Sequence, residues 1–155
     1  MSEACILCGG AERETVLEAA VPTAGATQVF RLLRCRTCGL VATHPQLSSQ
    51  ELEAHYGSAY WGRTRPDDLD WVRRDQRPRT NFLYRFAQRG RVLDVGCGLG
   101  LFLLALDPAQ WDRWGVEAMP LPHAEASQRL GADRILRGEL TTAALPEAHF
   151  EVITF

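Results

Sequence analysis

The chain contains no lysine, and all 17 of its basic side chains are arginine. This excludes a lysine Schiff base or a lysine general base from its chemistry. No run approaches the roughly 20 apolar residues that a helix needs to cross a bilayer. The first five residues have neither the basic region nor the apolar run of a signal peptide. We therefore predict no membrane partner and a cytoplasmic location.

A large charge of one sign is also missing, because the 155 residues carry a formal net charge of −2. Nucleic-acid binding by counterion release needs a basic surface, so we expect no nucleic-acid partner. The cluster of arginines in residues 73–79 is accompanied by aspartates in residues 67–75, which is typical of a solvated charged face. At 46% hydrophobic and 23% charged, the sequence predicts a folded protein with a buried core.

The sequence divides into three zones. Residues 1–45 hold two Cys-x-x-Cys pairs around two short strand-like runs, residues 46–90 are helical and loop-rich, and residues 91–155 alternate strand and helix signals. Alternation at this spacing predicts right-handed crossovers and a parallel sheet of about four strands, with helices. The predicted fold class is therefore α/β, with a Rossmann-like half-sheet after a small cysteine-rich domain.

Local patterns predict the elements of the first two zones. Apolar and β-branched runs predict strands over residues 14–21 and 28–34. Ser48 and Glu51 form a capping-box pattern, which predicts a helix to about residue 56, and residues 58–66 are predicted as a loop.

Proline and glycine positions bound the next helix. Pro78 prevents a single helix over residues 67–88, so we expect a helix to begin near Pro78 and to end at Gly90. Its spacing places apolar residues on one face: Phe82, Leu83, Phe86 and Ala87.

The third zone shows a regular alternation of elements. Apolar runs, prolines and glycines predict four strands, over residues 91–95, 111–117, 134–137 and 151–155, and two helices, over residues 99–106 and 121–130.

A glycine-rich loop directly follows the first strand of this zone. Asp94 lies near the strand's carboxyl end, and the glycines that follow have the pattern Gly-x-Gly-x-Gly over residues 96–100. A dinucleotide-binding loop has the pattern Gly-x-Gly-x-x-Gly and binds a pyrophosphate, which the Asp94 carboxylate would repel. The same carboxylate suits a cationic ligand. Glu117 ends the next strand, where a carboxylate can accept hydrogen bonds from ribose hydroxyls.

These features resemble motif I and the following strand of class I S-adenosylmethionine (SAM)-dependent methyltransferases, over roughly residues 78–155. The resemblance implies SAM as cofactor, with Asp94 near its methionine end. It places Glu139 and Leu140 beside the adenine ring. Cys97 lies between glycines and is interpreted as a small packing residue rather than a nucleophile. The full set of predicted cofactor-binding residues is Asp94, Gly96, Cys97, Gly98, Glu117, Ala118, Met119, Glu139, Leu140 and Thr154.

Four of the five cysteines form two Cys-x-x-Cys pairs, Cys5 with Cys8 and Cys35 with Cys38. In a cytosolic protein two such pairs favour a tetrahedral thiolate shell for a structural Zn²⁺ ion, over disulfides or redox motifs. The pattern resembles a zinc ribbon. A ribbon before motif I is similar to a subgroup of methyltransferases that act on sugars and other small molecules, which implies a small-molecule acceptor. By the same analogy Tyr60 and Trp61 are assigned to a lid near the cofactor, with packing between domains as the alternative.

The complete fold of this family has seven strands, and this sequence supplies four. We therefore expect the fourth strand to lie at an edge with Val152, Ile153 and Phe155 poorly covered, so that the chain self-associates or lacks a C-terminal half. The acceptor site and a catalytic residue are not assigned, and whether the chain is active alone stays open. The alternatives are a zinc-ribbon methyltransferase of rRNA or tRNA and a non-enzymatic interaction module.

Overall fold

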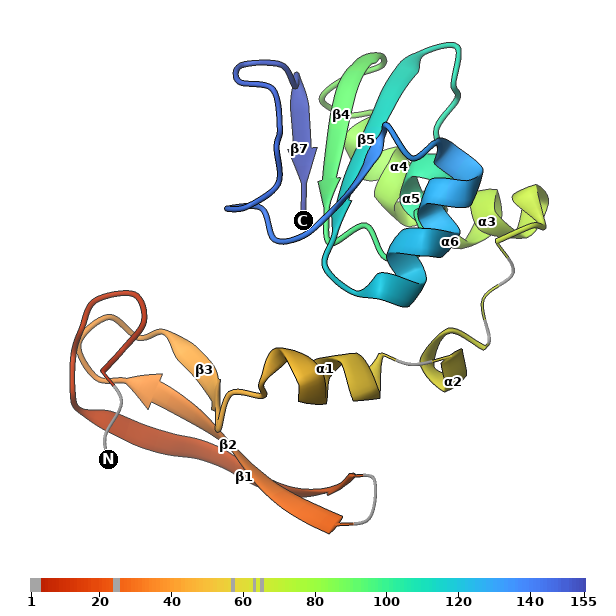
Figure 1. Cartoon of the computed structure of the whole chain (residues 1–155). Coiled ribbons are helices and arrows are strands. Elements are labelled where there is room, and N and C mark those ends of the chain that lie inside the picture. Colours follow the sequence, from red (N-terminus) through yellow and green to blue (C-terminus); the bar gives the residue numbers. More distant parts are fainter. Residues whose placement is uncertain (1–3, 24–25, 57, 63, 65) are drawn as a thin grey trace. The chain divides into compact units, whose positions relative to one another are not determined.

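The computed structural model describes residues 4–23, 26–56, 58–62, 64 and 66–155. The chain divides into two compact units, Met1–Leu52 and Glu53–Phe155. Each unit has its own sheet (Figure 1). The finer three-zone division predicted from the sequence stays a prediction.

The first unit is built on an antiparallel sheet in the order β1-β2-β3. Strands β1 (Arg13–Thr23) and β2 (Ala26–Cys35) form a long hairpin with a bulge between Thr15 and Leu17, and they extend the two predicted strands. Strand β3 (Val41–His44) was not predicted. Its four residues are too few to show an alternating pattern, and its place is set by pairing with β2.

The first turn of α1 (Ser49–His55) confirms the predicted capping box. The Ser48 backbone N–H donates to Glu51 Oε2 at 2.8 Å, and the Glu51 N–H donates to Ser48 Oγ at 3.3 Å. These reciprocal bonds satisfy two backbone donors that a helix start leaves without a partner.

The segment before the parallel sheet holds three short helices and corrects part of the prediction. Helix α2 (Ser58–Trp61) lies within the predicted loop. Helix α3 (Leu69–Asp75) was missed, although Asp68 caps it by accepting from the Trp71 N–H at 2.9 Å. The sequence signal for α3 was therefore its N-cap residue Asp68, which was interpreted only as part of a solvated charged face.

Helix α4 (Arg77–Leu83) begins beside Pro78, as predicted, but it ends seven residues before Gly90. The backbone continues through tight turns, and Gly90 begins a strand instead of capping a helix. Leu83 is buried, whereas Phe82 and Phe86 are 61% and 73% exposed and pack on each other with ring centres 5.2 Å apart, so only part of the predicted apolar face is buried. The helix is too short to include Phe86, and it packs through Thr80 and Leu83.

The second unit carries four parallel strands in the order β6-β5-β4-β7: β4 (Gly90–Val95), β5 (Trp111–Glu117), β6 (Ile135–Arg137) and β7 (Val152–Thr154). Helices α5 (Leu101–Ala105) and α6 (Pro120–Leu130) connect β4 to β5 and β5 to β6. Because both crossovers move in the same direction across the sheet, they place α5 and α6 on the same face (Figure 1). The predicted Rossmann-like half-sheet is confirmed.

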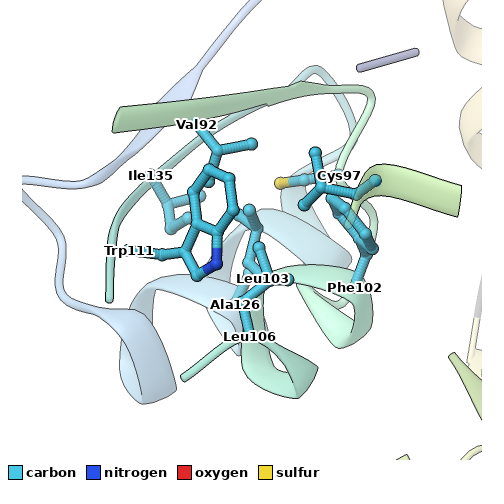
Figure 2. Close-up of a cluster of buried hydrophobic side chains, with 9 residues drawn as sticks. Val92, Cys97, Phe102, Leu103, Leu106, Trp111, Ala126 and Ile135 are labelled. Atoms are coloured by element: carbon cyan, nitrogen blue, oxygen red, sulfur yellow. The ribbon is translucent and has the colours of Figure 1, made fainter. Parts of the chain in front are cut away.

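One apolar cluster lies between this sheet and its helices (Figure 2). It consists of Leu83, Val92, Cys97, Phe102, Leu103, Leu106, Trp111, Ala126 and Ile135. At the sheet's edge, Ile153 and Phe155 are 52% and 85% exposed, as expected for β7 as the outer strand. Within the described part of the chain, no helix is both long enough and apolar enough for a bilayer crossing.

Candidate functional site

The glycine loop leaves β4 where β4 and β5 end side by side. Gly96, Gly98 and Gly100 all have positive φ angles, of 72°, 57° and 74°, which a side chain disfavours. A Cβ atom at Gly100 would also lie 2.6 Å from a Leu130 methyl carbon of α6. The loop therefore needs these glycines for its backbone shape, and Gly100 also for the packing of α5 against α6.

Glu117 is fixed against this loop at the end of β5. It is 8% exposed, and its Oε2 accepts from the Gly98 N–H at 2.8 Å while its Oε1 accepts from the Met119 N–H at 2.8 Å. Each carboxylate oxygen has a second lone pair, so the residue can still accept from a ligand hydroxyl. The Glu117 carboxylate therefore connects the glycine loop with the residues that follow β5.

Asp94 is 1% exposed and has two side-chain partners. Its Oδ1 accepts from Thr154 Oγ1 of β7 at 2.7 Å and from Arg79 Nη2 of α4 at 3.1 Å. Burial raises the pKa of Asp94, and the bonds from Thr154 and Arg79 oppose this rise. The site therefore joins predicted residues on β4 and β7 to an arginine of α4.

Arg79 corrects the prediction that its arginine cluster is only a solvated charged face. Its guanidinium carbon lies 4.4 Å from the centre of the Phe102 ring, and the same group donates to Asp94. Sequence reasoning missed this residue because Asp94 lies 15 positions further along the chain. No local spacing rule connects a helix with the end of the following strand.

Cys97 is buried, as its interpretation as a packing residue requires. A Cβ atom at Gly115 would lie 2.6 Å from its sulfur, so the thiol fills the space that this glycine leaves. Burial, together with the charges of Asp94 and Glu117, raises the pKa of Cys97 to about 12. The thiol is therefore protonated near neutral pH and is a poor nucleophile.

An aromatic group lies against the glycine loop. Trp61 closes off Gly98, where a Cβ atom would lie 3.1 Å from the indole ring. Tyr56 and Tyr60 pack on this indole, with ring centres 6.4 Å and 4.8 Å away. The predicted lid residue Trp61 thus contacts the predicted cofactor loop, while Tyr60 is 58% exposed.

The remaining predicted cofactor residues follow the ends of β5 and β6. Ala118 is exposed and Met119 half-buried. Gly138, just before Glu139 and Leu140, donates its N–H to the Glu117 carbonyl at 3.0 Å. Glu139 and Leu140 are exposed, so their side chains are open to solvent next to the Glu117 edge.

A cavity of about 720 Å³ opens beside Asp94 and was not predicted. It is bounded by α4, Phe102 of α5 and the β7 strand. Its lining includes Arg79 and Thr154, the two partners of Asp94, and the phenylalanines Phe82, Phe86 and Phe155.

The four cysteines of the first unit converge, with their sulfur atoms all within 4.8 Å of one another. Cys5 and Cys38 sulfurs lie 3.7 Å apart, and Cys8 and Cys35 sulfurs 3.6 Å apart. A tetrahedron with metal–sulfur bonds of about 2.3 Å has edges of about 3.8 Å, whereas a disulfide needs about 2.05 Å. The spacing fits four thiolates around one ion.

The two pairs have the same backbone geometry. Gly9 and Gly39 have φ angles of 72° and 78°, and their N–H groups donate to the carbonyls of Cys5 and Cys35. The turns direct amides at the sulfurs: the Cys8 N–H lowers the pKa of Cys5, and the Cys38 N–H lowers the pKa of Cys35 to about 6. At Cys5 and Cys35 the lower pKa favours the thiolate form that a metal needs. At Cys8 the backbone bond from Gly10 lowers the pKa, but hydrogen bonding with the Cys38 thiol and burial outweigh it and raise the pKa to about 12.

Comparison with known proteins bears on the second unit most directly. A family described as "Methyltransferase domain" matches residues 69–155, more than half of the chain. A solved structure described as SAM-bound CalS10, an amino pentose methyltransferase from Micromonospora echinaspora involved in calicheamicin biosynthesis, is 30% identical with a TM-score of 0.38. The match covers 72% of this chain and 44% of that one, so the chain spans less than half of that relative's length. Among curated proteins, none matches. The chain belongs to the methyltransferase domain family, as its resemblance to class I SAM-dependent methyltransferases predicted.

Proposed function

We propose that the second unit binds SAM along the carboxyl ends of β4 and β5, for methyl transfer to a small molecule. One observation carries the proposal. Two buried carboxylates, Asp94 and Glu117, end adjacent parallel strands on either side of a glycine loop, and the loop's Gly98 N–H holds Glu117 in place. Ligands of open α/β sheets bind at this edge.

The residues of this edge have separate roles in the proposal. Asp94 attracts the cationic methionine end, and Glu117 accepts from the ribose hydroxyls. Gly96, Cys97 and Gly98 supply a backbone surface that the cofactor can approach closely, while Thr154 orients Asp94. Around the adenine we place Ala118, Met119, Glu139 and Leu140. The bound cofactor would supply a methyl group activated by its sulfonium, and these residues hold and orient it.

A small-molecule acceptor is supported by the cavity next to Asp94. Its volume of about 720 Å³ lies within the range of pockets that hold small ligands, and its lining is aromatic with few polar groups. The net charge of −2 gives no reason to prefer a polyanionic acceptor. No residue is assigned as the catalytic base.

Calorimetry with S-adenosylhomocysteine tests the cofactor site. We expect binding by the unaltered chain, and a loss of about tenfold or more in affinity for Asp94→Asn and for Glu117→Gln, because each removes a charge-assisted contact. Glu147→Gln removes an exposed carboxylate that has no role in the proposed site, and it serves as the control. Absence of binding by the unaltered chain, or equal affinities for all variants, would refute the proposal.

We further propose that Cys5, Cys8, Cys35 and Cys38 bind a structural Zn²⁺ ion. The support is the tetrahedral spacing of the sulfurs and the backbone amides directed at them. Four thiolates leave no position open for a substrate, so the ion takes no part in methyl transfer. Thiolates of this kind persist in a reducing compartment, in line with the predicted cytoplasmic location. Elemental analysis should give one zinc per chain, and a metal content near zero would contradict the assignment.

A further inference from the structure

Arg79 gives the buried Asp94 its only cationic partner among the residues that the structure describes. The carboxylate side chain is 2% exposed, while the arginine side chain is 47% exposed. A carboxylate removed from water needs a compensating charge, because an isolated buried charge is strongly destabilising. Arg79 therefore balances Asp94 in the absence of a ligand and still keeps part of its guanidinium free to solvent.

The charge of this pair restricts which ligand it can receive. A lone Asp94 would suit a ligand that carries only a cation. The combination of Asp94 and Arg79 is neutral, so it matches a ligand end that carries both an ammonium and a carboxylate. A guanidinium binds a carboxylate through two parallel N–H bonds, and Arg79 has five N–H donors, one of which is given to Asp94.

The surroundings of Arg79 hold it in position for this task. Its guanidinium carbon lies 4.4 Å from the centre of the Phe102 ring, a cation–π contact that keeps the group beside this ring. Thr154 donates to the same oxygen of Asp94 at 2.7 Å, so Asp94 keeps its orientation when Arg79 turns. Arg79 also lines the cavity, where a ligand has room to enter.

We propose that Arg79 binds the α-carboxylate of the cofactor's amino-acid end while Asp94 takes the α-ammonium, so that the pair selects a zwitterion. The inference rests on the proposed cofactor site and adds a residue that determines specificity within it. On binding, the ligand's ammonium takes the place of the Arg79 N–H on Asp94. The released guanidinium donates to the ligand's carboxylate.

Three nucleosides separate the contributions in the unaltered protein. S-adenosylhomocysteine has both charges, its decarboxylated analogue has only the ammonium, and 5′-methylthioadenosine has neither. Calorimetry should show S-adenosylhomocysteine binding about tenfold or more tightly than the decarboxylated analogue, because only the first uses Arg79. Equal affinities for these two ligands would overturn the proposal without any variant. Failure to bind any of the three would instead remove the proposed cofactor site itself.

Variants of Arg79 then assign the preference to this side chain. Arg79→Met should abolish the preference for the carboxylate and change the affinity for 5′-methylthioadenosine by less than about twofold. Arg79→Lys should restore part of the preference, because it keeps the charge but not the fork. Arg77→Met, an exposed arginine on the same helix, is the matched control and should leave all three affinities unchanged.

Two outcomes distinguish other roles for Arg79. If the arginine only occupies the cation site, Arg79→Met will tighten both amine ligands. If it acts only by keeping Asp94 ionised, the variant will weaken both amine ligands equally and keep their ratio. Either result would overturn the proposal, and circular dichroism and thermal melting confirm that each variant is folded before its affinities are compared.

Discussion

The two units of the chain are stabilised in different ways. Among the residues of the first unit whose side chains the structure describes, only Cys5 and Cys35 are buried. Strands β1 and β2 are long, yet Val16, Leu17 and Val29 on them are between 43% and 55% exposed. The second unit buries a continuous cluster around Phe102, Leu103 and Trp111. One unit has almost no apolar core and the other is organised around one.

This difference in burial indicates that the two units are stabilised by different interactions. Small domains with little buried apolar area need a metal or disulfides, and the sulfur distances exclude disulfides here. The second unit buries a continuous apolar cluster, and this burial favours folding through the hydrophobic effect. Each unit should therefore fail under a different perturbation, and the predictions below follow from the largest expected effect to the smallest.

Removal of the proposed zinc ion should have the largest effect, and only on the first unit. Structural zinc sites contribute an apparent ~10–16 kcal/mol, more than the net stability of a small domain. A strong chelator, or Cys35→Ser, should abolish amide-exchange protection in β1, β2 and β3. Protection in β4 and β5, and the affinity for S-adenosylhomocysteine, should stay unchanged. Protection that persists in the hairpin after zinc removal would show that the ribbon folds without metal.

A cavity made in the apolar cluster should destabilise the second unit and leave the first unit unchanged. Leu103→Ala removes a fully buried side chain, which costs about 2–5 kcal/mol of unfolding free energy. Denaturant unfolding followed at sheet residues should show this loss, while the zinc content stays at one per chain. Leu17→Ala, 55% exposed in the hairpin, is the control and should change stability by about 0.5 kcal/mol or less. Equal losses for both variants would mean that the hairpin has a core of its own.

The sequence was sufficient for features that depend on local spacing. The alternating apolar runs of residues 91–155 predicted all four strands of the sheet, and β5 was predicted to the residue. The Gly-x-Gly-x-Gly pattern predicted a tight loop, and each Cys-x-x-Cys pair predicted a turn with two thiols on one side, because each of these features is fixed within a few positions of the chain. The prediction that a helix ends at Gly90 was wrong because a glycine can also begin a strand. Pairing of β4 with β5 decided that Gly90 belongs to the strand.

The part of the site that the sequence did not predict depends on contacts between distant segments. Arg79 reaches Asp94 because α4 packs near α5 and the end of β4, and nothing in residues 77–83 encodes that partner. Trp61 was proposed as a lid residue only by analogy, and its contact with Gly98 comes from the folded chain. Both residues belong to short helices before the sheet. In such helices the intrinsic helix propensity is a weak signal, and tertiary packing determines where the side chains lie.

Truncation of Trp61 should have a smaller effect, confined to the second unit. Because its indole covers Gly98, Trp61→Ala should weaken S-adenosylhomocysteine binding by a few fold, in line with about 0.5–1.5 kcal/mol for an aromatic contact. Tyr60→Ala removes a more exposed ring of the same cluster and should have less effect. Tighter binding after Trp61→Ala would mean that the indole occupies space that the ligand needs.

The smallest predicted effect is a pH dependence carried by Glu151 at the amino end of β7. Its carboxylate accepts from the Arg91 guanidinium and from the Arg91 backbone N–H at 2.7 Å, and Arg91 lowers the pKa of Glu151 from 4.5 to about 2. A lowered pKa in the folded state means that the pair stabilises the sheet above pH 4.5. This stabilisation is lost as the pH falls toward 2.

Thermal melting of the sheet between pH 2 and pH 7 checks this dependence, followed at the β4 and β7 amides. Glu151→Gln should lower the melting temperature only slightly at neutral pH, because an exposed ion pair is weak. It should leave the melting temperature unchanged near pH 2, where the stabilisation by this pair is already lost. Glu18→Gln breaks the exposed pair with Arg31 in the hairpin and should leave the profile of the sheet unaltered. If Glu18→Gln shifts the sheet's melting as much as Glu151→Gln does, the two units are coupled in stability. The separation drawn from their different burial would then be wrong.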